Sequence, residues 1–84
     1  MSRDTEYNER LAKHILQDVF RELWFPNEKI RNILFDTYVA NIPVMNRYIA
    51  ETKTDLRAYY YNIKQILLCT SGATLRSKRL EKQR

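Results

Sequence analysis

The stretch VMNRYIAETKTDLRAYYYNIKQILLCTS, residues 44–71, runs for 28 residues between Pro43 and Gly72 without a residue that breaks helices. Its apolar residues, together with one threonine, recur at alternating steps of four and three: Met45, Ile49, Thr52, Leu56, Tyr59, Ile63 and Ile66. A spacing of about 3.5 residues places these side chains in one stripe along a helix. Each buried apolar side chain contributes about 1.5 to 3 kcal/mol, so such a stripe needs a partner helix to cover it.

A helix-capping signal inside this stretch leaves open the alternative that it forms two helices and not one. The sequence TKTD at 52–55 matches a pattern that begins many helices, and it would divide the stretch into helices at 43–51 and 55–70. We favour one helix over 44–70, because the stripe passes through Thr52 without a change of phase and a core threonine can bond to a carbonyl one turn back. Gly72 then stands where a glycine commonly closes a helix.

The rest of the chain predicts two amphipathic helices, over 5–24 and 27–41, which end at Pro26 and Pro43. The apolar face of the first helix comprises Leu11, Ala12, Ile15, Leu16, Val19 and Leu23. The face of the second helix comprises Ile30, Ile33, Leu34, Tyr38 and Ile42. Because the stripes are broad and the links are short, the sequence predicts an all-α fold, a small three-helix bundle with a long third helix.

The composition is typical of a small folding domain that gains from association. The chain has 84 residues, 44% of them hydrophobic, and a domain of this size buries only about 60 to 65% of its unfolded surface. We therefore expect a homodimer or a protein partner, with a self-sufficient monomeric bundle as the alternative. The single cysteine and the polar first ten residues indicate an intracellular protein, cytoplasmic or nuclear, and no apolar run is long enough to span a membrane.

Positive charge is concentrated at the carboxyl end. Residues 1–74 carry ten Lys or Arg and nine Asp or Glu, whereas residues 75–84 carry five basic residues and one acidic residue. We therefore divide the chain into a bundle domain, 1–74, and a basic, flexible C-terminal tail, 75–84, that contacts an anionic partner such as nucleic acid. A purely solubilising tail is the alternative. The basic residues of the tail are Arg76, Lys78, Arg79, Lys82 and Arg84.

A second cationic feature is expected on the outer side of the third helix, opposite the stripe. Five side chains project there: Arg47, Arg57, Tyr61, Lys64 and Leu68. Such a side could lie along a phosphate backbone while the tyrosine stacks on a base. The alternative is an ordinary solvated face, since Glu51 and Asp55 lie nearby and the spacing matches no named nucleic-acid-binding motif.

The sequence shows no pattern typical of catalysis, cofactor binding or metal binding. A single glycine excludes the glycine-rich phosphate loops, and one histidine with one cysteine does not provide a usual zinc site. We expect His14 to make a solvated contact along its helix and Cys69 to be a small buried thiol beside the core. A small enzyme that needs no metal is the least favoured interpretation.

Two functions remain open. The first is a non-enzymatic helical adaptor that acts through self-association and protein contacts, with core and interface residues Met45, Ile49, Leu56, Tyr59, Ile63, Ile66, Phe20, Trp24 and Phe25. For the last three we expect a role in closing the core, with an exposed aromatic anchor as the alternative. The second function is a small nucleic-acid-binding regulatory protein that uses the tail and the outer side of the third helix. We rank the adaptor first because residues 1–74 are almost neutral and the strongest signal is apolar surface.

Overall fold

Four helices and one short antiparallel ladder make up the computed structural model, which describes residues 2–76. In chain order the elements are α1 (Ser2–Arg21), β1 (Leu23–Trp24), α2 (Glu28–Ala40), α3 (Ile42–Thr52), α4 (Leu56–Thr70) and β2 (Thr74–Leu75). The structure is 79% helical, which confirms the all-α class. None of the helices in the described part of the chain is long and apolar enough to cross a membrane.

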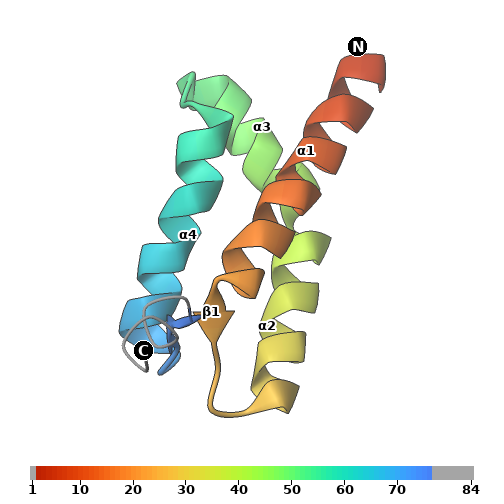
Figure 1. Ribbon diagram of the computed structural model, residues 1–84. Helices are drawn as coiled ribbons and strands as arrows, with labels where there is room; N and C mark the ends of the chain where they lie inside the picture. The colour runs from red at the N-terminus through yellow and green to blue at the C-terminus, as the bar shows by residue number, and fades with distance from the viewer. Residues whose placement is uncertain (1, 77–84) are drawn as a thin grey trace.

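Helix α1 is the centre of the arrangement, because it packs against α2, α3 and α4. In Figure 1, α2 and α3 follow one another back along α1, and α4 then returns beside it. The chain bends between α2 and α3 at Asn41, and Pro43 occupies the first turn of α3, where a proline costs no hydrogen bond. The buried residues form one core, to which α1 contributes Ala12, Ile15, Leu16, Val19 and Phe20.

The prediction of one long helix over 44–70 is wrong, because the chain reverses direction between α3 and α4. Lys53 adopts the left-handed conformation, with φ of 56°, and its amide closes the end of α3 on the carbonyls of Ile49 and Ala50. The side chain of Asp55 accepts a hydrogen bond from the amide of Ala58 at 2.9 Å and so begins α4. The local capping residues therefore decide this segment, and the division that we ranked second is the correct one.

Helix α4 is also rotated relative to the predicted stripe. Its buried side chains are Tyr60, Ile63 and Leu67, whereas Ile66 is 49% exposed. Burial raises the pKa of Tyr60 to about 12, with smaller contributions from Tyr59 and Glu9. The Tyr60 hydroxyl donates a hydrogen bond to Asn46 Oδ1 at 2.6 Å, which joins α4 to α3. The stripe is displaced because α4 packs chiefly on α1 of the same chain.

The first helix ends three residues earlier than predicted, and the residues after it form β1. Leu23 pairs with Leu75 and Trp24 pairs with Thr74 in an antiparallel ladder. The amide of Arg76 then donates to the carbonyl of Glu22 at 2.8 Å. The first two residues of the predicted tail are thus joined to β1 and its flank. The remainder of that segment, including Lys78, Arg79, Lys82 and Arg84, lies outside the described residues.

Candidate functional site

Helix α2 is the least covered helix of the described residues. It contributes no buried side chain, although it contains six large apolar residues. One side rests on α1, where Phe35 and Tyr38 contact the ring of Phe20 at centroid distances of 5.3 and 6.3 Å. On the other side, Ile30 and Ile33 are 45% and 55% exposed. The prediction that both isoleucines face the core is wrong, because a helix covered mainly on one side cannot bury so broad a stripe.

The exposed isoleucines belong to a small surface with a regular pattern. Ile30, Ile33 and Thr37 follow one another at steps of three and four, so they share one side of α2. Lys29 lies one turn before Ile33 and Asp36 nearly one turn after it, and all five residues are exposed. We call these five residues the α2 face. Within residues 2–76, neither Lys29 nor Asp36 has an ion-pair partner.

Local hydrogen bonds hold the α2 face in place. The Asn27 side chain accepts bonds from the amides of Lys29 and Ile30, at 2.9 and 3.2 Å, and fixes the residue at which α2 begins. The Thr37 hydroxyl donates to the Ile33 carbonyl at 2.8 Å. Its polar group is therefore satisfied within the helix, so Thr37 can meet an apolar surface without leaving an unpaired donor.

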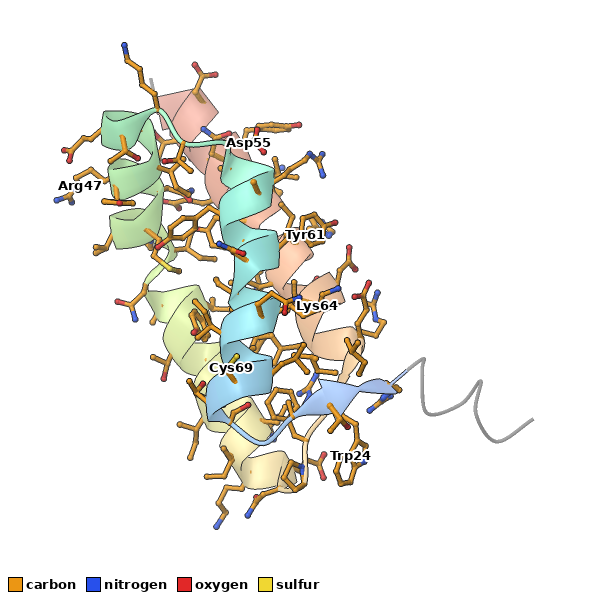
Figure 2. All side chains as sticks on the ribbon, turned by 90° about the vertical axis from the view of Figure 1, so that its left-hand side faces the viewer. Trp24, Arg47, Asp55, Tyr61, Lys64 and Cys69 are labelled. Carbon is orange, nitrogen blue, oxygen red and sulfur yellow. The ribbon has the colours of Figure 1, made fainter. Side chains whose placement is uncertain are left out.

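The structure separates the residues of the predicted cationic side. Arg47 belongs to α3 and lines a groove beside Asn8 and Glu9 of α1. Figure 2 shows Arg47 on one side of the molecule, and Tyr61 and Lys64 on another. Lys64 Nζ lies 2.7 Å from Glu22 Oε1, so its charge is paired. Arg57 and Tyr61 remain exposed on α4, but the break between α3 and α4 removes Arg47 from their side.

The predicted core and interface residues mostly lie inside the chain's own core. Among them, only Trp24 and Ile66 are exposed; Phe20, Phe25, Ile49 and Ile63 are buried, and Met45, Leu56 and Tyr59 are half-buried. Phe20 and Phe25 stack with their ring centroids 5.6 Å apart and close the end of the core. The surface available to a partner therefore differs from the predicted one, and it includes Ile30 and Ile33 of the second predicted helix.

His14 and Cys69, the two residues considered for chemistry, lie on different helices. His14 is exposed on α1, and Cys69 is exposed on α4, which corrects the prediction of a buried thiol. In the described part of the chain, no three His, Cys, Asp or Glu side chains are grouped so that they could hold a metal ion.

Comparison with known proteins adds no analogue for this arrangement. No family model, curated protein or solved structure matches the chain.

Proposed function

We propose that this protein is a non-enzymatic helical interaction protein that self-associates through the α2 face. In this arrangement two copies pack their α2 helices antiparallel about a two-fold axis near Ile33. The observation that carries the proposal is the position of Ile33, 55% exposed between a cation one turn before it and an anion nearly one turn after it. A surface with this order of charges is complementary to itself.

The spacing of the charges supports a second copy as the partner. With a rise of about 1.5 Å per residue, Lys29 lies about 6 Å before Ile33 along the helix axis and Asp36 about 4.5 Å after it. In an antiparallel pair, Lys29 of one copy and Asp36 of the other therefore differ by only about 1.5 Å along the axis. The two-fold axis forms this pair twice. On the other flank of Ile33, Ile30 of one copy meets Thr37 of the other.

The size of the apolar surface indicates a transient dimer. Ile30 and Ile33 are each about half exposed, so covering one of these side chains contributes about 1 kcal/mol. The dimer covers both isoleucines in each of its two copies, four side chains in all, which contributes about 4 kcal/mol. Two exposed ion pairs add about 0.2 to 1 kcal/mol each. This total near 5 kcal/mol is offset by the translational and rotational free energy that association costs, about 4 kcal/mol or more, so the dissociation constant is on the order of millimolar or weaker. We therefore expect association that depends strongly on concentration.

A charge exchange tests the proposal. Lys29→Glu and Asp36→Lys should each weaken self-association in sedimentation equilibrium, because each homodimer then contains two repulsive pairs. An equimolar mixture of the two variants should form a heterodimer, in which both pairs are again attractive, and the double variant should regain the association of the original chain.

The matched control for this experiment is Lys13→Glu, which changes an exposed lysine on α1 by the same charge. It should leave the association constant unchanged. If the two single variants associate as the original chain does, or if their mixture associates no better than either alone, the α2 face is not the self-association surface.

A further inference from the structure

A groove lies at the end of the molecule where the ladder meets the start of α2. It consists of two adjoining hollows. The first, about 320 Å³, is lined by Gln17, Phe20, Arg21, Arg31, Phe35 and Arg76. The second, about 580 Å³, is lined by Trp24, Phe25, Pro26, Glu28, Arg31 and Arg76. Because Arg31 and Arg76 line both hollows, we treat them as one surface and call it the arginine groove.

The arginine groove carries guanidinium groups without acidic partners. Among the described residues, neither Arg31 nor Arg76 forms an ion pair, whereas Arg21 binds Asp18 at 3.0 Å at the rim. One carboxylate, that of Glu28, lines the groove. Guanidinium groups bind phosphate oxygens through paired N–H donors, so an anion with phosphate geometry suits this surface.

Both of the central arginines are anchored by the fold. The guanidinium carbon of Arg31 lies 5.9 Å from the ring centroid of Phe20, and its Nη1 donates to Asn32 Oδ1 at 3.0 Å. Arg76 is fixed through its backbone amide, which donates to the Glu22 carbonyl at 2.8 Å. The contacts of the Arg31 side chain lower the entropy that it loses when it binds a ligand, whereas at Arg76 the fold holds the backbone in place.

An aromatic side chain stands beside these charges. Trp24 is 41% exposed on β1 and lines the second hollow together with Pro26. Figure 2 shows Trp24 at the ladder end of the molecule, away from Arg47 and Asp55. An exposed indole next to guanidinium groups is the combination with which proteins bind single strands, since the ring stacks on a base while the cations contact the phosphates.

We propose that the arginine groove binds single-stranded nucleic acid, with a phosphate group between Arg31 and Arg76 and a base stacked on Trp24. A duplex does not offer an unstacked base to the indole, so the single strand is preferred.

The arginine groove is distinct from the α2 face. Arg31 and Ile33 are two positions apart on α2, so they project from nearly opposite sides of the helix. Self-association through Ile33 therefore leaves Arg31 accessible. The proposal of self-association and the proposal of strand binding can therefore be tested independently, because a chain that does not dimerise can still bind a strand at the arginine groove.

The experiment uses the only tryptophan of the chain as a local probe. Twelve-nucleotide oligo(dT) should quench the fluorescence of Trp24 in the full chain, and the affinity should fall steeply with salt. Arg31→Gln and Arg76→Gln should each weaken binding and reduce the slope of log K against log salt by at most about 0.7, the value for one phosphate contact on a single strand, because the two arginines share that phosphate. Circular dichroism should show both variants folded, and Arg76→Gln, which changes an exposed side chain, secures the test if Arg31→Gln does not fold.

Trp24→Leu should weaken binding by about 5- to 150-fold in an anisotropy assay with labelled oligo(dT), and Trp24→Phe should restore part of it. Arg57→Gln on α4 is the matched control and should change neither affinity nor slope. Unchanged binding by Arg76→Gln together with weaker binding by Arg57→Gln would overturn the proposal in favour of the outer side of α4. Equal affinity for duplex without quenching would also overturn it, as would quenching by anionic lipid vesicles alone.

Discussion

The buried hydroxyl of Tyr60 makes the stability of the fold depend on alkaline pH. An unfolded tyrosine titrates near pH 10, whereas the folded pKa of Tyr60 is raised to about 12, first by burial and then by Tyr59 and Glu9. Between these values the unfolded chain loses the proton before the folded chain does. The stability that the neutral hydroxyl contributes is therefore fully present below pH 10 and is lost as the pH rises through 12.

The magnitude is large for so small a domain. Two pKa units correspond to at most about 2.7 kcal/mol, and we expect about 1 to 2.5 kcal/mol. At about 0.05 to 0.15 kcal/mol per residue, the whole chain is stable by about 4 to 13 kcal/mol. Burial also raises the pKa of Tyr38, which adds a contribution of the same sign.

Tyr60→Phe separates this effect from general alkaline unfolding. At pH 7 the variant should be less stable by about 1 to 3 kcal/mol, because Asn46 loses the hydroxyl that donates to its Oδ1. Between pH 10 and 12 the variant should lose less stability than the original chain, so the two curves should converge. Urea unfolding followed by circular dichroism from pH 7 to 12 measures this, with the exposed Tyr61→Phe as control. Parallel curves over that range would show that Tyr60 does not carry the pH dependence.

Three further predictions follow from the fold. A chain that ends at Arg76 keeps the ladder and the hydrogen bond from the Arg76 amide to the Glu22 carbonyl, and it should melt as the full chain does. A chain that ends at Gly72 loses β2 and should lose about 2 to 3 kcal/mol, read as a fall of about 10 to 20 °C in thermal melts. Asp55→Ala removes the cap of α4 and should cost about 0.5 to 2 kcal/mol in urea unfolding; no loss would mean that the cap does not stabilise α4. Ile63→Asp should prevent folding, because it buries an unpaired charge, whereas Ile66→Asp should leave a folded helical spectrum; the reverse order would mean that α4 is rotated differently.

The sequence predicted the elements whose ends carry strong signals. Pro26 and Pro43 lie in or next to links between helices, and Gly72 has the positive φ, 77°, expected of a glycine after a helix. The prediction of one helix over 44–70 was wrong because it relied on the regular spacing of the apolar residues. The link between α3 and α4 is three residues long, so the step from Thr52 to Leu56 equals one helical step in number, although the chain reverses there. A regular spacing therefore does not prove a continuous helix, and the capping residues were the better guide.

The ladder and the two proposed surfaces were beyond sequence reasoning for a different reason. Strands of two residues leave no periodic pattern, so the pairing of Leu23 with Leu75 could not be foreseen. That pairing is what brings Arg76 to the same groove as Arg31 and Trp24. Likewise, whether Ile33 is covered depends on which helices pack beside α2, and this is a property of the tertiary structure.

Helix α2 links the two proposals, because it carries Ile33 on one side and Arg31 on nearly the opposite side. A two-fold dimer formed through the α2 face holds two arginine grooves, each directed away from the interface. A strand long enough to reach both grooves would bind the second one at a raised effective concentration, so its affinity would exceed that of a strand that reaches only one. Dimerisation and strand binding would then strengthen each other, even though the dimer alone is weak and no residue belongs to both surfaces.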